Sequence, residues 1–419
     1  MNSNFYKKYL KYKRKYLYLK NQVGGSIIYK DCLRTIRDIL EFNTFIRNPK
    51  KSKNECKKEE ILSRIIGNKI IIDKDGVSTF YTISKFLGKG GFGCVFKIRN
   101  DTDNKFYVIK FGFTSPNEEA KTLEELMRDI VPKCNYKAIT YGSIRINGEN
   151  VYFIIFNFKG DIDLFKFLVK GENCKFIPNY IKDILTCLIE INKKGYHADL
   201  KTENIAIDES NTASIIDYGL SKTYTQKIIT IPMEIENLTA GIRDDEISDI
   251  GIVQTSIDLL IFFLMRDTKI ELFNNLYACY IEIMLHTFDN FGLFWLIINC
   301  FYMNKFIEII GKNYISFMSI QQTEYTKKIY IELYFNLNPP ITDFEISILT
   351  AVGITIDPLF RTEFIESIRL KLKTDKKFDL IFRTDENYTS FMNLLLGIIR
   401  VDPSQRTSLV DLLQHPIFQ

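Results

Sequence analysis

Residues 197–204 read His-Ala-Asp-Leu-Lys-Thr-Glu-Asn, and Asp-Tyr-Gly follows at residues 217–219. The first stretch brings together a carboxylate, an ammonium group and an amide, and the second adds another carboxylate. One carboxylate can orient a hydroxyl group and accept its proton, while the amide and the other carboxylate hold a metal ion on phosphate oxygens. Transfer of a phosphoryl group to a protein hydroxyl needs this division of roles.

The two segments resemble the catalytic loop of protein kinases and the metal-binding turn that follows it. The resemblance assigns Asp199 to the substrate hydroxyl and Lys201 to the transferring phosphoryl group. It assigns Asn204 and Asp217 to Mg²⁺, with Mn²⁺ as the alternative ion, and it implies ATP as the phosphate donor. A lysine at position 201 is typical of the serine/threonine kinases. The implied fold is α+β and bilobal, with a small β-rich N-lobe and a large, mostly helical C-lobe that carries an insertion.

A glycine-rich loop lies upstream, between two segments that alternate like strands. Glycines let the backbone approach phosphates and present N–H donors, because no Cβ stands in the way. A strand after the loop disfavours a Rossmann fold, in which the loop opens a helix. By the resemblance, this region contacts ATP through Leu87, Gly88, Lys89, Gly90, Gly91, Phe92, Gly93, Cys94 and Val95.

Lys110 ends a third predicted strand in a Val-Ile-Lys setting and matches the phosphate-anchoring lysine of the family. Its partner should be an acid on the next helix, which is predicted to run to about Ile130. Ser115 and Glu118 fit a capping box, which would occupy Glu118 at the start of that helix. Glu119 is then the expected partner of Lys110, with Glu118 as the alternative.

An apolar strand at residues 151–156 leads into the segment that the resemblance assigns to the nucleoside. Phe156 takes the gatekeeper position and should close the pocket behind the adenine. Phe158 lies in the hinge that offers backbone groups to the adenine, and Asp163 is expected near the ribose.

Two residues depart from the common kinase pattern. Ala198 stands where most kinases have an arginine, so a phosphate on the activation segment lacks its usual partner. We therefore expect activity that does not depend on phosphorylation of Ser221, Thr223 or Thr225. Tyr218 replaces a phenylalanine, and together with Ala198 it resembles the vaccinia-related and casein-kinase-1 branch.

Three residues beyond the metal-binding turn are expected to stabilise the C-lobe. Glu234 closes the activation segment, and Asp249 begins a buried helix, with Glu246 as the alternative. Arg406 lies in an Asp-Pro-x-x-Arg setting that resembles the end of a kinase domain, where it would form a buried ion pair with Glu234.

The C-lobe is longer than the family requires. The interval between positions 249 and 406 predicts an insertion within about 268–390. The aromatic-rich apolar run at residues 291–303 is too short to span a bilayer and is interpreted as another buried helix.

Residues 1–27 form a basic tail without acidic residues. Its aromatic and leucine side chains recur at helical spacing, which predicts a helix. Such a helix can contact anionic membrane or nucleic acid, or dock on the body of the protein. The Lys/Tyr pattern also resembles an N-terminal segment found on proteins of giant DNA viruses, which implies an intracellular protein that is packaged in a virion.

The other predicted parts are an N-terminal extension (28–77), the N-lobe (78–158) and the C-lobe (159–419). A composition of 46% hydrophobic and 26% charged residues is typical of a globular chain and excludes a disordered one. The eight cysteines are scattered without a C-x-x-C pair. They are expected to be reduced thiols that form neither a disulfide framework nor a zinc site.

Two other functions are alternatives at this point. A pseudokinase would keep the fold and bind nucleotide as a scaffold, although here every catalytic position is filled. A small-molecule kinase of related fold usually lacks the segment that contains Arg406. A protein substrate is therefore the expected partner, and no sequence-specific contact with nucleic acid is expected.

Overall fold

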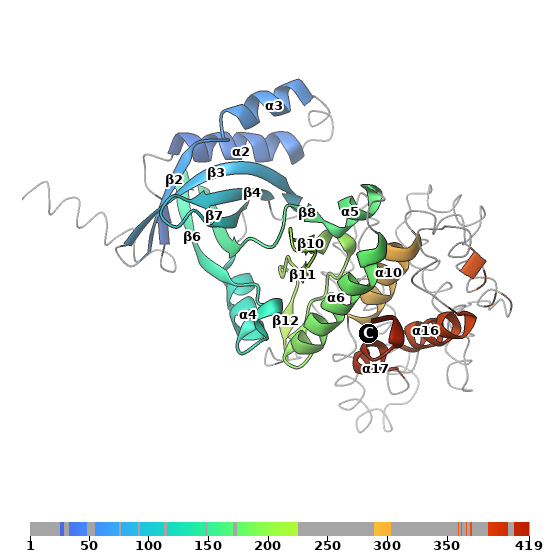
Figure 1. The fold of residues 1–419 in the computed structure, drawn as a ribbon. Helices are drawn as coiled ribbons and strands as arrows, with labels where there is room; N and C mark the ends of the chain where they lie inside the picture. The colour runs from blue at the N-terminus through green and yellow to red at the C-terminus, as the bar shows by residue number, and fades with distance from the viewer. Residues whose placement is uncertain are drawn as a thin grey trace, which may run out of the picture. The chain divides into compact units, whose positions relative to one another are not determined.

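The computed structural model divides the chain into two compact units (Figure 1). Unit 1 comprises the described residues of 1–128 and 136–159, and unit 2 those of 129–135 and 160–419. The described residues are 26–28, 33–47, 55–74, 77–90, 93–112, 115–146, 149–170, 174–224, 289–302, 384–400 and 406–418, with the single positions 359, 362, 366, 369 and 370.

Unit 1 is built on a closed antiparallel barrel with strand order β1-β2-β3-β4-β5-β7-β6. Parallel pairing between β1 and β6 closes it. Side chains alternate between the two faces of each strand, so one face can be buried while the other serves a site. The strands are β1 (Ser26–Ile28), β2 (Lys69–Lys74), β3 (Val77–Gly90), β4 (Gly93–Asn100), β5 (Phe106–Gly112), β6 (Ala138–Ile146) and β7 (Glu149–Asn157).

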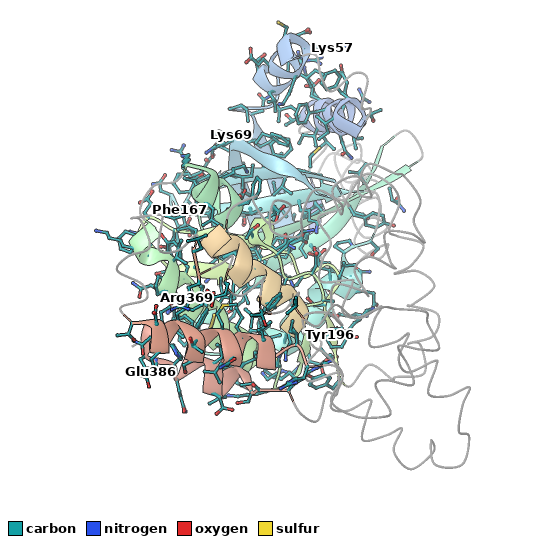
Figure 2. The ribbon with its side chains drawn as sticks, turned by 90° about the vertical axis from the view of Figure 1, so that its right-hand side faces the viewer. Lys57, Lys69, Phe167, Tyr196, Arg369 and Glu386 are labelled. Carbon is teal, nitrogen blue, oxygen red and sulfur yellow. A yellow bond between two sulfur atoms is a disulfide. The ribbon has the colours of Figure 1, made fainter. Side chains whose placement is uncertain are left out.

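Two helices before the kinase-like region cover the sheet of unit 1: α2 (Leu33–Arg47) and α3 (Glu55–Ser63) (Figure 1). Apolar residues at helical spacing on α2 are fully buried and share one hydrophobic core with β3, β4, β5 and β7. The Phe42 ring lies 4.9 Å from that of Phe86 and 6.4 Å from that of Phe96. Lys57 on α3 is exposed at the outer side of this helix pair (Figure 2). α2, α3 and β2 are therefore an integral part of unit 1.

Unit 2 is organised around α6 (Ile177–Ile191), whose apolar positions at helical spacing are fully buried. Short elements pack on it and place the loops that carry the candidate site. The remaining elements are the 3₁₀ helices η2 (Pro132–Cys134), η3 (Cys174–Phe176), η4 (Thr202–Asn204) and η7 (Pro416–Phe418), the strands β8 (Ile162–Asp163), β9 (Gly195–Tyr196), β10 (Ile205–Ile207), β11 (Ala213–Ile215) and β12 (Lys222–Thr223), and the helices α5 (Leu164–Lys170), α10 (Asn290–Tyr302), α16 (Asp385–Gly397) and α17 (Leu409–Leu413).

The apolar run expected as a buried helix at residues 291–303 is α10, and this prediction is confirmed. Leu293, Phe294 and Ile297 are fully buried on it. Within the described residues, no helix is long and apolar enough to cross a membrane.

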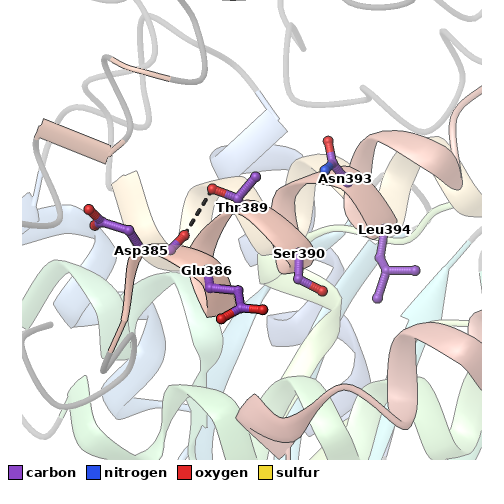
Figure 3. Close-up of a pocket in the computed structure, with 6 residues that line it drawn as sticks. All are labelled: Asp385, Glu386, Thr389, Ser390, Asn393 and Leu394. Atoms are coloured by element: carbon purple, nitrogen blue, oxygen red, sulfur yellow. Dashed lines mark hydrogen bonds between the residues drawn. The ribbon is translucent and has the colours of Figure 1, made fainter.

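A shallow depression of about 590 Å³ follows the exposed face of α16. Arg369 pairs with Asp385 at the start of this helix, near Glu386 (Figure 2). The lining side chains lie along one side of the helix (Figure 3): Asp385, Glu386, Thr389, Ser390, Asn393 and Leu394. None of the residues assigned to catalysis lines it.

The expectation that every cysteine is a reduced thiol is wrong for two of them. A disulfide joins Cys134 on η2 to Cys187 on α6, 53 residues later in the chain. The packing of η2 on α6 brings the two sulfurs together. The spacing of the two cysteines along the chain gives no sign of this pairing. Cys56 is an exposed thiol and Cys300 a buried one.

Replacing Phe42 by alanine should lower the free energy of unfolding of unit 1 by about 3–5 kcal/mol, because a fully buried ring leaves a cavity. Urea unfolding of the full-length protein measures the change. Phe80→Ala is the matched control, since Phe80 is 43% exposed and should cost far less. Equal, small effects of both substitutions would contradict a shared core between α2 and the sheet.

Candidate active site

The glycine-rich loop is a hairpin between β3 and β4, in which Gly90 pairs with Gly93. Gly93 has φ 154°, and a Cβ at this position would lie 1.6 Å from the Phe111 carbonyl oxygen. Only glycine fits so close to β5. Leu87 and Val95 are half-buried on the two strands of the hairpin.

The other residues assigned to this loop are placed less fully. Gly88, Lys89 and Gly90 lie on β3, and Cys94 is buried on β4. Gly91 and Phe92 lie outside the described residues. Their contact with ATP remains a prediction.

Lys110 pairs with Glu119, its predicted partner. Lys110 points away from the core because its neighbours on β5, Ile109 and Phe111, face α2. Its Nζ lies 3.3 Å from both carboxylate oxygens of Glu119, on α4 (Asn117–Met127). Glu118 instead pairs with Lys121 at 3.9 Å, and its side chain is 79% exposed. The side chains of Lys110 and Glu119 are only 9% and 11% exposed.

The capping box expected at the start of α4 is not formed. The helix begins at Asn117, and Pro116 occupies the N-cap position, where its side chain offers no hydrogen bond. Ser115 Oγ accepts a long bond of 3.4 Å from the Asn117 N–H. The helix also ends at Met127, before Ile130, because the chain turns to an extended conformation at the next residue.

Of the residues assigned to the nucleoside, Phe156 lies on β7, Phe158 directly after β7, and Asp163 at the end of β8. Phe156 is buried and stacks on Tyr136, with ring centroids 5.0 Å apart. Phe158 is half-buried, and the Lys97 ammonium lies 4.1 Å from the centroid of its ring. Asp163 caps α5, since one carboxylate oxygen accepts the Lys166 N–H at 2.7 Å and the other pairs with the Lys166 ammonium. The roles of these residues toward ATP remain predictions.

The catalytic loop holds Asp199 from both sides. The Lys201 ammonium lies 3.1 Å from one carboxylate oxygen, and the Asn204 amide nitrogen donates to the other at 2.7 Å. The same amide nitrogen donates to the Asp199 carbonyl at 2.8 Å. This arrangement fixes the direction of the carboxylate before any substrate hydroxyl is present.

Asn204 and Asp217 lie on adjacent segments. The Ile216 N–H donates to the Asn204 carbonyl at 2.9 Å, so the residue before Asp217 is bonded to Asn204. Asn204 turns its amide nitrogen toward Asp199, so its amide oxygen is the atom that would bind a metal ion. A carboxylate and an amide oxygen are ligands that Mg²⁺ accepts, so the donor set fits the ion that the resemblance implies.

Asp289 is the functional residue that sequence reasoning missed. It lies directly before α10, and its two carboxylate oxygens accept the N–H groups of His197 at 2.7 Å and of Ala198 at 2.8 Å. Burial raises the pKa of this carboxyl, and the two donated hydrogen bonds act in the opposite direction. Asp289 thereby holds the backbone of the catalytic loop.

We expected Asp249, or Glu246, to begin the buried helix beyond the activation segment. Both lie outside the described residues, so this expectation stays a prediction. Asp249 and Asp289 each precede an apolar run, so this sequence pattern does not distinguish one from the other. α10 lies within the insertion expected at about 268–390, and Asp289, directly before this helix, anchors the catalytic loop.

The peptide between His197 and Ala198 is fixed on several sides. Ala198 has φ 67°, a left-handed conformation that costs an L-residue roughly 1–2 kcal/mol. Ser221 Oγ donates to the His197 carbonyl at 3.0 Å. The fully buried His197 ring packs edge-on against Tyr218, and its Nε2 lies 3.1 Å from the Ile216 carbonyl. Burial lowers the pKa of His197, so the ring is neutral at pH 7.

Arg406 is half-buried, and its Nε donates to the Arg400 carbonyl at 2.8 Å. Its expected partner Glu234 lies outside the described residues, so the ion pair remains a prediction. Arg406 precedes Thr407, whose N–H donates to the Gly397 carbonyl at 3.1 Å. A Cβ on Gly397 would lie 2.1 Å from Thr407 Oγ1, which explains the glycine at the end of α16.

Asp289→Asn should remove the protection of the His197 and Ala198 amides from hydrogen exchange and destabilise unit 2 by about 1–3 kcal/mol. Asparagine keeps one acceptor but turns an NH₂ group toward the other N–H donor. Exchange mass spectrometry and urea unfolding measure the two effects. Asp208→Asn is the matched control. The same carboxylate oxygen of Asp208 accepts the hydrogen bonds from Ser210 and Thr212, and asparagine keeps one such oxygen. Unchanged protection of residues 197–198 in Asp289→Asn would contradict the anchoring role.

Comparisons with known proteins agree with this geometry. Residues 81–235 match the model of the protein kinase domain. CBL-interacting protein kinase 28 of Oryza sativa subsp. japonica is 28% identical over 148 residues, which cover 34% of this chain and 33% of the relative. Serine/threonine-protein kinase cot-1 of Neurospora crassa is 24% identical over 208 residues, or 47% and 35%. The probable serine/threonine-protein kinase FPV226 of fowlpox virus is 30% identical over 157 residues, or 33% and 53%.

The matches thus span about a third to a half of the length of these relatives. The finer resemblances, to the vaccinia-related and casein-kinase-1 branch and to N-terminal segments of giant DNA viruses, remain predictions. The glycine hairpin, the Lys110–Glu119 pair and the residue 197–217 region all lie inside the matched range, and they have the arrangement that the motifs predict. Residues 81–235 are therefore similar to the protein kinase domain, and the β-rich unit 1 and the helices of unit 2 are consistent with an α+β kinase fold.

Proposed function

We propose that the protein is a serine/threonine protein kinase, which transfers the γ-phosphoryl group of ATP to hydroxyl groups of a protein substrate. The observation that carries the proposal is the catalytic loop, in which Lys201 and Asn204 each hold one oxygen of the Asp199 carboxylate. The names of the relatives support a serine/threonine specificity. A lysine two residues after the catalytic aspartate agrees with it.

The described side chains divide the work of phosphoryl transfer. Asp199 orients the substrate hydroxyl and accepts its proton, and Lys201 stabilises the negative charge of the transferring group. Lys110, fixed by Glu119, binds the phosphates of ATP. Asn204 and Asp217 would hold Mg²⁺, which offsets the charge that develops on the phosphate oxygens.

We further propose that catalysis does not require phosphorylation of the activation segment. Ala198 supplies no guanidinium for a phosphate, and the start of the segment is already fixed. Thr223 is 2% exposed on β12, which pairs with β9. The Tyr224 N–H donates to the Lys194 carbonyl at 2.9 Å, and its hydroxyl donates to the Asn192 carbonyl at 3.1 Å. Ser221 is 4% exposed and bonded to the catalytic loop.

The basic tail is proposed to set the location of the protein in the cell. Residues 1–25 lie outside the described residues, so this proposal rests on their lysines and on the absence of acids there. The positive charge supports contact with anionic membrane or nucleic acid. The resemblance to viral segments supports packaging in a virion. Following the location of a variant without residues 1–25 tests it.

Asp199→Asn should lower phosphate transfer by about 10²–10⁴-fold, because the amide cannot accept the substrate proton. Transfer is measured with Mg·ATP and a generic acidic or basic protein. Asp208→Asn, the same chemical change in the hairpin between β10 and β11, should keep the activity of the wild type. Equal transfer by the wild type and Asp199→Asn would refute this mechanism. Nucleotide binding without turnover by either would identify a pseudokinase.

Treatment of the purified protein with a phosphatase should leave its activity unchanged, since Ala198 offers no charge to a phosphate. Activity is measured before and after treatment, and phosphate is mapped by mass spectrometry. A control kinase that depends on activation-segment phosphate must lose activity in the same experiment. Loss of activity here, restored only when Ser221, Thr223 or Thr225 carries phosphate, would disprove the independence.

A further inference from the structure

The segment Asp129–Asn135 connects α4 to β6 and belongs to unit 2, although the chain on both sides of it belongs to unit 1. It contains η2 and begins at Asp129, which has φ 57°. The chain therefore enters unit 2 for one short stretch between two elements of unit 1. Whatever holds this segment in unit 2 also limits the movement of the chain directly after α4.

Two neighbouring residues attach the segment to α6. Cys134 forms the disulfide with Cys187, and both residues are buried, with 4% and 1% exposure. Lys133 pairs with Asp183, which lies one helical turn before Cys187 on the same face of α6. The second oxygen of Asp183 accepts the Ala213 N–H at 3.0 Å, so the helix position itself is well supported.

The two attachments differ in strength. The Lys133 side chain is 44% exposed, and an ion pair at such a position contributes about 0–1 kcal/mol. The disulfide is covalent and shielded from solvent. Its reduction removes the covalent attachment and leaves the weaker ion pair in place.

Movement of the segment can reach the candidate ATP site through α4. Met127, the last residue of α4, accepts a hydrogen bond through its sulfur from the Tyr136 N–H at 3.4 Å. This contact closes the base of the loop that contains Cys134. The same helix carries Glu119, which positions Lys110.

We propose that Cys134–Cys187 is a thiol–disulfide exchange site, at which a dithiol reductant releases the segment 129–135 and weakens the binding of Mg·ATP. When local opening of the segment exposes the buried bond, a thiolate of the reductant attacks one cysteine sulfur, and the other cysteine leaves as a thiolate. The second thiol of the reductant then displaces the first cysteine, which yields two cysteine thiols and the oxidised reductant. A disulfide oxidant such as glutathione disulfide reverses the reaction. Only the effect on Mg·ATP rests on the proposed function.

The experiment compares the full-length protein after treatment with oxidised glutathione and after reduction with dithiothreitol. Reduction should lower Tm by roughly 10 °C, as expected for opening a loop of this length. It should also raise the Kd for Mg·ATP several-fold, measured by calorimetry in the Asp199→Asn background to prevent turnover. Peptide mapping of the alkylated, unreduced protein should recover the linked peptides of Cys134 and Cys187.

Three variants make the test specific. Cys134→Ser and Cys187→Ser should behave like the reduced wild type and should not respond to dithiothreitol. Cys56→Ser, at an exposed thiol on α3, should respond like the wild type. Lys133→Met should leave the oxidised protein nearly unchanged but increase the loss of Mg·ATP affinity on reduction, because it removes the second attachment.

Alkylation of both cysteines in the unreduced, denatured protein would overturn the proposal, since no disulfide would then exist. A lower Tm with an unchanged Kd would overturn it as well and leave the disulfide a structural cross-link. Redox-dependent binding of Mg·ATP without phosphate transfer in either state would support the exchange site. That last result would refute the proposed kinase activity alone.

Discussion

The structure depends most on the carboxylate of Asp289, which accepts two consecutive backbone N–H groups of the catalytic loop. Those donors are buried, so without an acceptor they would each lose hydrogen bonds to water with no replacement. The interaction keeps Ala198 in a left-handed conformation and thereby sets the direction in which Asp199 leaves the loop. Lys201 and Asn204 then only have to hold a carboxylate that already points correctly.

Unit 1 holds the ion pair between Lys110 and Glu119 in a largely buried position. Lys110 and Glu119 satisfy each other because strand alternation turns Lys110 away from the core and α4 brings Glu119 opposite. The core on the other face of the sheet is formed by α2 and α3 together with inward-facing residues of the strands. α2 and α3 thus support the Lys110–Glu119 pair from behind the sheet.

We propose that the region around residue 198 separates catalysis from control. Replacement of the usual arginine by Ala198 leaves the carboxylate, amide and ammonium groups of the loop in place. The hydroxyl of Ser221 and the strand pair β9–β12 fix the start of the activation segment through hydrogen bonds that need no phosphate. The cross-link between η2 and α6 offers a different place at which the state of the protein can be changed.

The sequence alone determined the parts in which chemistry depends on near neighbours in the chain: the glycine hairpin, Lys110, Asp199, Lys201, Asn204 and the turn at Asp217. It also indicated Glu119 over Glu118, although the capping box behind that choice is absent. Only the tertiary structure selected Asp289, because an aspartate before an apolar run occurs more than once and the bonded partner lies 92 residues away. The pairing of Cys134 with Cys187 was decided in the same way, since spacing along the chain does not encode which side chains the packing of helices brings together.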